Sequence, residues 1–319
     1  MPRLLVIVGP TAVGKTATSI EVAQQLNGAV ISADSMQVYR GMDIGTGKVR
    51  PEETRGVKHY LIDILDPGDV FSVAQYVELA DAAIQKVVAQ GQQPIIVGGT
   101  GLYIRALVDG FLFADPGPDY LYRAQMEKTA AEQGVEAVHQ LLAQVDPESA
   151  QRIHSNDLKR VIRALEVYHT TGEKLSAKIA QTKKLPPRYA ASFYGLTAPR
   201  QFLYQRIDQR IEQMLEDGLV REVMGLLSQG LMTYLTSNQA IGYKEIVEYL
   251  SGKATYAAAV DKLKQANRNY AKRQLSWFRR DSRIKWFDIT AYSSVQELGS
   301  AIVQDFGGYK SQRREDILQ

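Results

Sequence analysis

Two hydrophobic periods alternate along the first third of the chain. Short continuous apolar runs between turn residues are typical of buried parallel strands, and the stretches between these runs show helical spacing. Ser72 and Gln75 are spaced as a capping box at the start of one such helix. We predict strands at Leu4–Val8, Ala29–Ala33, Tyr60–Leu65 and Pro94–Val97, and helices at Ala17–Leu26, Ser72–Gln90 and Leu102–Val108. This alternation predicts a doubly wound α/β core with a parallel sheet.

The pattern changes after the turn-forming cluster Asp115-Pro116-Gly117-Pro118. From Tyr120 to about Thr170 the periodicity is helical only, and Lys183-Lys184-Leu185-Pro186-Pro187 ends this region. An apolar run at Ala191–Leu196 then returns the chain to the sheet. We therefore expect a core made of residues 1–115 and 191–319, interrupted by an all-helical insertion domain at 116–190.

The C-terminal region is predicted to be mainly helical. Helical spacing covers Gln201–Leu227 and Asn238–Phe278, and Ile284–Asp288 reads as a last short strand. The tail Lys310–Gln319 is polar, and we expect it to be frayed.

A phosphate-binding loop follows the first predicted strand. The segment Gly9-Pro10-Thr11-Ala12-Val13-Gly14-Lys15-Thr16 matches G-x-x-x-x-G-K-[ST] and precedes a helix. Small residues let backbone N–H groups converge on phosphate oxygens, and the helix N-terminus adds its positive end. Lys15 would place a charge on the outer phosphate, and Thr16 would offer a hydroxyl to magnesium. The loop predicts a di- or triphosphate ligand but leaves open whether that phosphate is transferred, hydrolysed or released.

Two other strand ends carry candidate chemistry, because the carboxyl ends of parallel strands line the ligand crevice. Asp34 follows the second strand and could accept a proton or hold a metal; alternatively, it caps a helix that starts at Ser35. The fourth strand ends in Gly98-Gly99-Thr100, where an NTP-hydrolysing enzyme normally has an acid. The Thr100 hydroxyl suits a hydrogen bond to a leaving oxygen, although it could instead cap the next helix.

Composition narrows the class of protein. The chain has 319 residues, of which 45% are hydrophobic, and it has no cysteine, which excludes disulfides, Cys-type zinc sites and thiol catalysis. Its four histidines lack metal-ligand spacing, and no apolar run approaches the roughly 18 residues of a membrane span. We expect a cytoplasmic, monomeric protein that does not associate with membranes.

Positive charge is concentrated near the C-terminus. The net charge is +3, but residues 262–285 contain nine Lys or Arg and one acid, so the rest of the chain is negative. Such a stretch predicts a polyanionic partner. Tyr270, Trp277 and Phe278 lie among these cations and could stack on unpaired bases, or could form an ordinary core stripe.

Two further basic clusters occur on predicted helices. Arg206 and Arg210 share a helix face and could clamp a diphosphate, or could form a solvated charged face. Lys159, Arg160 and Arg163 lie within one turn of the insertion.

Taken together, these residues resemble the tRNA dimethylallyltransferase family (tRNA isopentenyltransferases, in the bacterial form). The resemblance runs through nearly the whole chain and rests on GPTAVGKT, ISADSMQVYRGMDIGTGK, HYLIDILDP, PIIVGGTGLYIRAL, NDLKRVIRALEVY, AIGYKE and AKRQLSWFRR, which occur in the family's order. Eukaryotic members often add a zinc finger, and a chain without cysteine lacks it.

The resemblance implies transfer of the dimethylallyl group from dimethylallyl diphosphate to the exocyclic amine of the adenosine just 3′ of the anticodon, in tRNAs reading U-initial codons. It implies that Asp34 accepts the amine proton, that Thr100 hydrogen-bonds the bridging oxygen, and that Lys15, Thr16 and Arg210, with magnesium, stabilise the diphosphate held by Gly9–Thr16. It also implies that the adenine is flipped out and that Gln37 reads or replaces it. The implied tRNA-binding residues are Asp34, Ser35, Met36, Gln37, Thr100, Arg123, Lys159, Arg160, Arg163, Gly242, Lys244, Lys272, Arg273, Gln274, Trp277 and Arg279.

Other functions share parts of this pattern. A P-loop kinase of a small metabolite or nucleotide, or an isopentenyltransferase acting on a free nucleotide, has the phosphate loop but needs no basic C-terminal helix. An RNA-binding NTPase or a non-catalytic RNA-binding module is a further alternative. Gly98-Gly99-Thr100 disfavours hydrolysis, and Asp34 beside an intact phosphate loop disfavours a role in binding alone.

Overall fold

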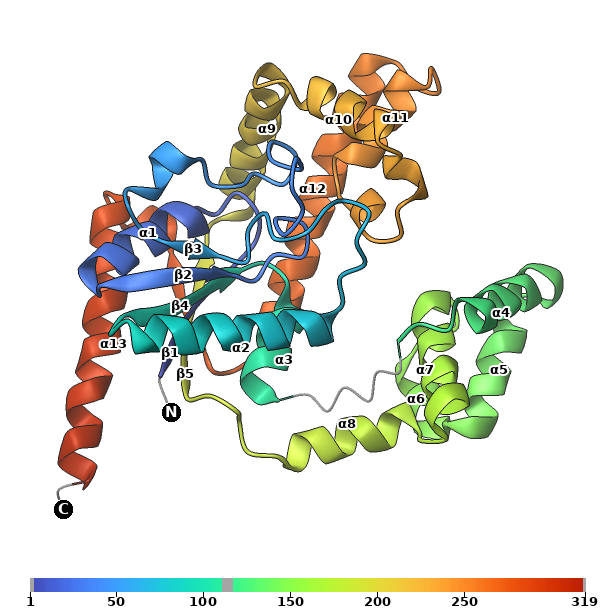
Figure 1. Cartoon of the computed structure of the whole chain (residues 1–319), viewed down its shortest axis with the longest axis horizontal. Coiled ribbons are helices and arrows are strands. Elements are labelled where there is room, and N and C mark those ends of the chain that lie inside the picture. The colour runs from blue at the N-terminus through green and yellow to red at the C-terminus, as the bar shows by residue number, and fades with distance from the viewer. Residues whose placement is uncertain (1–2, 111–116, 318–319) are drawn as a thin grey trace. The chain divides into compact units, whose positions relative to one another are not determined.

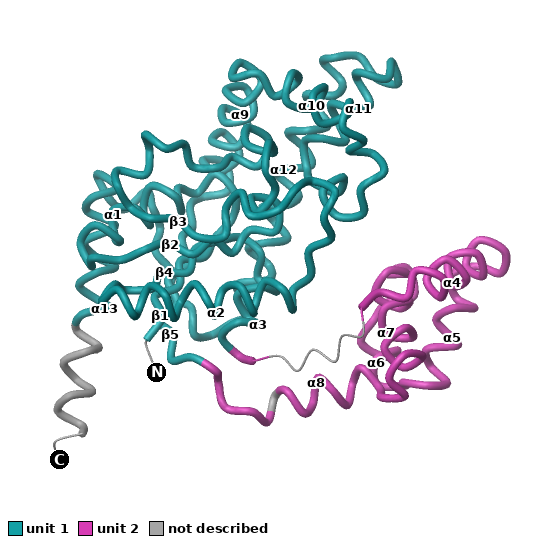
Figure 2. The backbone as a smooth tube through the Cα atoms, viewed as in Figure 1, with its two compact units in different colours: residues 1–108, 189–319 teal, residues 109–188 magenta. Residues whose placement is uncertain are grey.

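The computed structural model describes residues 3–110 and 117–317, with side chains except at Lys183 and 308–317. The chain forms two compact units, which are distinguished in Figure 2. Unit 1 comprises Met1–Val108 and Tyr189–Gln319, and unit 2 comprises Asp109–Arg188.

Unit 1 is built on a six-stranded parallel sheet with the order β3-β2-β4-β1-β5-β6 (Figure 1). In the register of the central strands, Val6 pairs with Ile96 on one side and with Phe193 on the other. The strands are β1 (Leu4–Val8), β2 (Gly28–Ser32), β3 (His59–Tyr60), β4 (Gln93–Gly98), β5 (Ala191–Thr197) and β6 (Ile284–Asp288). The predicted α/β class with a parallel sheet is confirmed.

Helices cover this sheet and extend from it (Figure 1). Helix α2 packs on β2 and β4, α1 packs against α13, and α9 packs against α12. The capping box of Ser72 and Gln75 forms as predicted at the start of α2. The helices of unit 1 are α1 (Lys15–Gln25), α2 (Val73–Ala89), α3 (Gly101–Asp109, whose last residue belongs to unit 2), α9 (Arg200–Glu216), α10 (Leu219–Ser228), α11 (Tyr243–Leu250), α12 (Tyr256–Phe278) and α13 (Val295–Ile317), with short 3-10 turns η1 (Pro51–Thr54), η2 (Leu231–Thr233), η3 (Ser237–Gln239) and η4 (Ile289–Ala291).

The third strand is shorter than predicted. Beyond Tyr60, Leu61 (φ 63°) and Asp63 (φ 54°) adopt left-handed conformations that are incompatible with a strand. Leu65 makes an isolated bridge to Tyr39 instead of extending the ladder.

The C-terminal helices also differ from the prediction. Gly218, at φ 105°, separates α9 from α10, and Gly252, at φ 72°, follows α11. Both predicted long helices are therefore interrupted where glycine adopts a left-handed conformation. Helix α13 is absent from the prediction, and the tail expected to be frayed is helical as far as Ile317, with residues 318–319 outside the described part.

Unit 2 is helical over its described residues, as its periodicity predicts. Its core includes Val138 and Leu142 of one helix and Val161 and Leu165 of another. Its helices are α4 (Tyr120–Gln133), α5 (Val135–Val145), α6 (Pro147–Arg152), α7 (Leu158–Thr171) and α8 (Leu175–Lys184). The Asp115-Pro116 part of the predicted breaker lies outside the described residues. None of the described helices combines the length and apolarity needed to cross a membrane.

Candidate active site

A large cavity of about 1560 Å³ lies within unit 1. The loop after β1 contributes Lys15 and Thr16, the loop after β2 contributes Asp34 and Gln37, and α9 contributes Arg210. These residues come from the positions that the carboxyl-edge rule for parallel sheets selects. The structure thus brings the predicted phosphate loop, the predicted acid and one predicted arginine to the same cavity.

The phosphate loop has the backbone shape of an anion cradle. Ala12 (φ 62°) and Gly14 (φ 95°) are left-handed, which turns successive N–H groups toward one side. Helix α1 begins at Lys15 without a side-chain cap, so its first amides keep their hydrogen-bonding capacity for a ligand. Gly9 is also required, because a Cβ there would lie 2.7 Å from the Leu196 carbonyl oxygen.

Backbone carbonyl oxygens contact Lys15 and Arg210, two of the cations that line the cavity. Lys15 Nζ donates to the carbonyls of Gly9 (3.0 Å) and Pro10 (2.7 Å), and Arg210 Nη2 approaches the Gly47 carbonyl at 3.5 Å. Arg206, four residues before Arg210, donates to the Ala12 carbonyl at 2.9 Å. Both arginines of the predicted pair therefore reach the phosphate-binding region, although through different contacts.

Burial destabilises the positive charge at both positions. It lowers the pKa of Lys15 to about 7, with the nearby charge of Arg210 acting in the same direction and that of Asp34 opposing it. Burial likewise lowers the pKa of Arg210, and Asp34 again opposes the shift. A bound anion would relieve this unfavourable electrostatic arrangement.

Asp34 forms a turn of its own rather than a helix cap. Its Oδ1 accepts hydrogen bonds from the amides of Met36 (2.9 Å) and Gln37 (3.3 Å). No helix begins at Ser35, so the alternative that Asp34 is a helix N-cap is wrong. The turn fixes one carboxylate oxygen and keeps the side chain at the cavity wall.

The turn after β4 depends on glycine at three positions. A Cβ at Gly98 would lie 2.1 Å from the Ala33 carbonyl oxygen, one at Gly99 would lie 2.0 Å from Gln274, and one at Gly101 would lie 2.2 Å from the Trp277 ring. Helix α12 therefore packs directly against this turn. The glycines at positions 98, 99 and 101 are therefore needed for close packing, in addition to any role toward a ligand.

Thr100 lies just behind the cavity wall. Its Oγ1 accepts a hydrogen bond from the Ser35 amide at 3.2 Å, which ties the β4 turn to the Asp34 turn. Val97 and Gly98 of the same turn line the cavity, whereas Thr100 itself does not.

Tyr270 of α12, which the sequence predicts only as a base-stacking or core residue, belongs to the candidate site. It lines the cavity, and its hydroxyl lies near the side chains of Thr100 and Gln274. Burial raises its pKa, and the charge of Asp34 raises it further, which places Tyr270 close to the carboxylate. The signal in the sequence was an aromatic residue within a basic helix, but nothing there indicated its proximity to Asp34.

Gln274 connects two of the predicted loops. Its Oε1 accepts a hydrogen bond from the Thr11 amide at 2.9 Å, and its Nε2 donates to the Gly99 carbonyl at 3.1 Å. The side chain is 5% exposed. Its amide thus holds the phosphate loop and the β4 turn in place.

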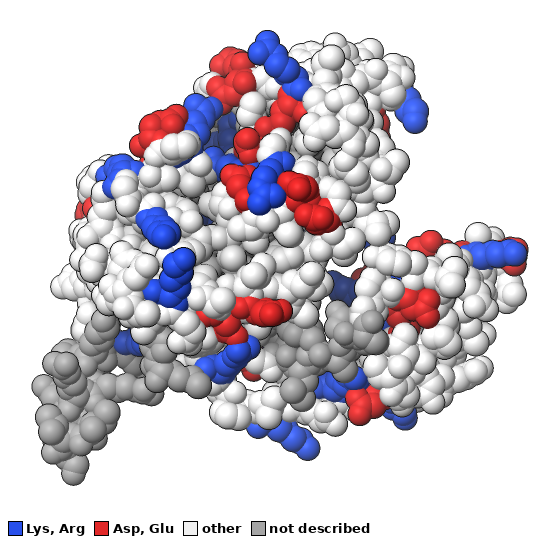
Figure 3. Space-filling model, viewed as in Figure 1, with Lys and Arg blue, Asp and Glu red and all other residues white. Residues whose placement is uncertain are grey.

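The basic stretch 262–285 is partly neutralised within the protein. Five of its nine cations form ion pairs with carboxylates: Lys262–Glu248, Lys264–Glu212, Arg268–Asp208, Arg283–Asp281 and Lys285–Asp305. Figure 3 shows acidic and basic side chains interspersed on the visible face of unit 1. The other four cations of the stretch have no ion-pair partner among the described residues, and all are exposed: Lys272, Arg273, Arg279 and Arg280.

The predicted basic residues of unit 2 fall into two groups. Lys159 and Arg160 are exposed, and Arg160 pairs with Asp157 at 3.4 Å. Arg123 and Arg163 instead contact the buried carboxylate of Glu166.

The AIGYKE segment lies at the start of α11. Gly242, at φ 104°, forms the turn before this helix, and the Lys244 side chain is exposed. Neither lines the cavity. Among the side chains that the structure describes, no three His, Asp or Glu residues gather into a metal-binding group.

Comparison with known proteins agrees with this geometry. Residues 37–281 match the family model described as IPP transferase. The chain is 50% identical to the tRNA dimethylallyltransferase of Carboxydothermus hydrogenoformans, over 96% of this chain and 97% of that protein.

Solved structures show the same relationship. The tRNA isopentenylpyrophosphate transferase of Bacillus halodurans matches with a TM-score of 0.75 and 43% identity, over the full length of both chains. A eukaryotic dimethylallyltransferase acting on tRNA matches with a TM-score of 0.80 and 28% identity, over 97% of this chain and 80% of that one. The chain therefore belongs to the IPP transferase family, the family of the tRNA dimethylallyltransferases.

Proposed function

We propose that this protein transfers a dimethylallyl group from dimethylallyl diphosphate to the exocyclic amine of the adenosine 3′-adjacent to the anticodon in tRNA, with release of diphosphate. Membership of the family supports this activity, and so does the arrangement of the cavity. The observation that carries the proposal is the placement of Asp34 beside Lys15 and Arg210 in one cavity.

The absence of an acid at the end of β4 distinguishes this chemistry from nucleotide hydrolysis. The strand ends in Gly98 and is followed by Gly99 and Thr100, so the turn offers no carboxylate to orient a water. A diphosphate that only departs as a leaving group needs charge stabilisation but no activated water. The cavity supplies that stabilisation and lacks the hydrolytic acid at this turn.

In the proposed reaction, the bond between the prenyl carbon and the bridging oxygen breaks, and a bond from that carbon to the adenine nitrogen forms. Lys15 and Arg210 stabilise the negative charge that develops on the departing diphosphate. Asp34 accepts the proton that the amine loses, using the carboxylate oxygen that its own turn leaves available. Thr100 acts from behind the wall by accepting the hydrogen bond of the Ser35 amide, which fixes the Asp34 turn.

The cavity also fits a magnesium ion bound with the diphosphate. Thr16 is exposed at the first turn of α1 and lines the cavity, as a phosphate-loop hydroxyl ligand should. Magnesium keeps several waters and commonly takes only one or two protein ligands beside substrate phosphates, so no cluster of acids is required. When bound, the ion would offset the charge of the diphosphate.

Each unit supplies exposed cations that could bind RNA phosphates. Lys272, Arg273 and Arg279 of unit 1 are exposed and form no ion pair with any side chain that the structure describes, so their charge is available to backbone phosphates. Lys159 and Arg160 are exposed on unit 2. The target adenine must leave its stack to reach Asp34, and Gln37 lines the cavity where it would arrive.

The test uses radiolabelled dimethylallyl diphosphate, magnesium and an unmodified anticodon stem-loop with adenosine 3′ of the anticodon. We expect label on the RNA, and no label on a matched stem-loop that has guanosine at the target position. A parallel reaction with ATP labelled in its terminal phosphate tests the kinase alternative. Phosphate transfer to a small molecule without prenyl transfer would reject the proposed function.

A further inference from the structure

The loop Met42–Lys48 forms one wall of the cavity and holds two of its functional side chains. Gln37 Nε2 donates to the carbonyls of Thr46 and Gly47, at 3.3 Å each. Arg210 packs so closely on this loop that a Cβ at Gly47 would lie 1.6 Å from its Nη2. The position of the loop therefore sets the positions of Gln37 and Arg210.

A carboxylate from outside the cavity anchors this loop. Glu222 of α10 accepts hydrogen bonds from three consecutive amides: Oε2 from Asp43 (2.9 Å) and Ile44 (2.7 Å), and Oε1 from Gly45 (3.0 Å). Tyr243 donates its hydroxyl to the same Oε1 at 2.7 Å. One side chain thus satisfies three backbone donors of a segment that has no regular structure of its own.

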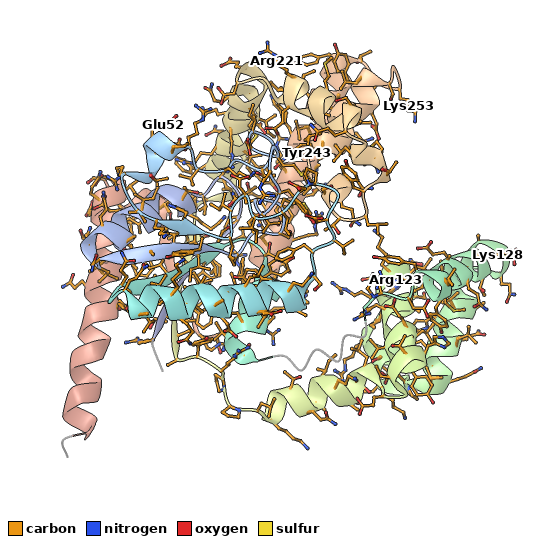
Figure 4. The ribbon with its side chains drawn as sticks, viewed as in Figure 1. Glu52, Arg123, Lys128, Arg221, Tyr243 and Lys253 are labelled. Carbon is orange, nitrogen blue, oxygen red and sulfur yellow. The ribbon has the colours of Figure 1, made fainter. Side chains whose placement is uncertain are left out.

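Tyr243 fits against the same loop by its ring. It is 1% exposed, and a Cβ at Gly45 would lie 2.6 Å from the ring, so only glycine permits this approach. Figure 4 shows Tyr243 in the interior of unit 1, whereas Arg221, the neighbour of Glu222 in sequence, lies at the outer surface. Neither Glu222 nor Tyr243 is among the residues that line the cavity.

The hydrogen bonds that Glu222 accepts are stronger than a glutamate on a helix surface needs for the helix to form. Hydrogen bonds to an ionised acceptor are about twice as strong as neutral ones, and Glu222 accepts four of them. Burial and the Glu222 charge both raise the pKa of Tyr243, so its hydroxyl stays a donor across the working range of pH. Three of the four hydrogen bonds come from loop amides, and the fourth comes from Tyr243, whose ring packs against the same loop.

We propose that Glu222 and Tyr243 are positioning residues for prenyl transfer, which hold the Met42–Lys48 loop so that Gln37 and Arg210 face the cavity in the productive arrangement. This inference rests on the proposed function for its kinetic consequence, but its structural part does not depend on any activity.

The first experiment measures amide hydrogen exchange in the full-length protein without ligands. We expect Glu222→Gln to speed exchange in peptides covering residues 42–48, because an amide side chain offers one acceptor and places a donor against the remaining N–H groups. Glu216→Gln is the matched control, since Glu216 is exposed at the end of α9 and has no hydrogen bond to the loop. Unchanged exchange at residues 42–48 in Glu222→Gln would overturn the inference.

The second experiment measures prenyl transfer at a temperature well below unfolding of each variant. For Glu222→Gln we expect kcat/KM for dimethylallyl diphosphate to fall about ten- to a hundredfold, the effect of losing hydrogen bonds to a charged group. The Kd for tRNA should not change, because the exposed cations of α12 are untouched. Tyr243→Phe, which keeps the ring beside Gly45, should show a smaller loss in the same direction.

The outcomes separate the two proposals. Wild-type kinetics in Glu222→Gln, with only a lower melting temperature, would reduce Glu222 to a structural residue and overturn the inference. If the wild-type chain transfers no prenyl group, the proposed function fails, and the exchange rates alone still decide whether Glu222 holds the loop.

Discussion

Glu166 in unit 2 and Asp34 in unit 1 each lie near two basic side chains, but among the described residues only Glu166 forms hydrogen bonds with them. In unit 2, Glu166 is fully buried and bonds both partners directly: Arg123 at 2.7 and 2.8 Å, and Arg163 at 2.6 Å. In unit 1, Asp34 lies at the cavity wall with Lys15 and Arg210 close by, but its hydrogen bonds in the described structure go to backbone amides.

The electrostatics follow the geometry. Burial raises the pKa of Glu166, but hydrogen bonds from Arg123, Arg163 and the Asp119 amide outweigh it and hold the pKa below its ordinary value of 4.5. In the cavity, by contrast, burial and the nearby charge of Arg210 lower the pKa of Lys15 to about 7, and the attraction of Asp34 does not offset them. The same residue types therefore fix a fold in one unit and leave charge available to a ligand in the other.

The largest expected effect is at Asp34. Asp34→Asn keeps the shape of the side chain but removes the proton acceptor, so we expect transfer to slow by about 10²- to 10⁴-fold with tRNA binding near normal. Single-turnover transfer and filter binding, run on the same stem-loop, measure the two separately. Asp66→Asn, at an exposed carboxylate paired with Arg40, serves as the control.

If Asp34→Asn weakens tRNA affinity as much as it slows transfer, Asp34 is a binding residue rather than a base. The contrast with Glu166 would then lose its basis, because both carboxylates would serve only to position other groups.

Removal of the other carboxylate should destabilise unit 2 rather than stop the chemistry. Glu166→Ala removes the buried carboxylate that Arg123 and Arg163 both contact, and because each arginine is 36% exposed we expect the loss to be that of hydrogen bonds to a charged group, about 1.5–3 kcal/mol. Hydrogen exchange of residues 120–171 in the full chain measures this local loss. Exchange in the β1 and β4 peptides is the internal control, and an equal loss there would show that the two units do not unfold separately.

The pH dependence of substrate binding tests whether the charge of Lys15 contributes to binding the diphosphate. Protonated Lys15 attracts the diphosphate, and its pKa of about 7 means that this charge is present below pH 7 and lost as the pH rises. From this group we expect affinity for dimethylallyl diphosphate to fall about tenfold between pH 6 and pH 8. Lys15→Arg keeps its charge throughout, so its profile should be flatter; an equally steep profile would assign the dependence to another group.

Local patterns predicted much of this molecule because the responsible residues are neighbours in sequence. The phosphate loop, the Ser72–Gln75 capping box and the strand bounds of Leu4–Val8 and Ile284–Asp288 follow from short-range rules. The error at Tyr60–Leu65 has a distant cause: Lys48, whose side chain is buried, pairs with Asp63, which stands in a left-handed conformation. No pattern within residues 60–65 reveals this ion pair or the left-handed conformation.

The same limit explains why Glu222 and Tyr243 are absent from the predicted site and why Tyr270 is predicted only as a base-stacking or core residue. Tyr270, Glu222 and Tyr243 reach the loops of the N-terminal half from α10, α11 and α12, far away in the sequence. Tyr243 lies within AIGYKE, the motif for which the resemblance implies Gly242 and Lys244 as tRNA-binding residues. A family motif does not show which of its side chains points inward. Likewise, the charge count of the basic stretch could not reveal that five of its nine cations are already paired.

The smallest effect is expected at the surface, where paired and free cations can be compared directly. Arg279→Ala removes an exposed cation without an ion-pair partner in the described structure, so tRNA affinity should fall a few-fold and the slope of log Kd against log salt should decrease by about 1. Lys262→Ala removes the same formal charge from the same basic stretch, but Lys262 is paired with Glu248. Titrations across a range of salt concentrations should therefore leave the slope of Lys262→Ala close to that of wild type. Equal slopes for the two variants would mean that ion pairing does not decide which cations bind RNA. An unchanged slope for Arg279→Ala alone would give Arg279 a packing role at the end of α12.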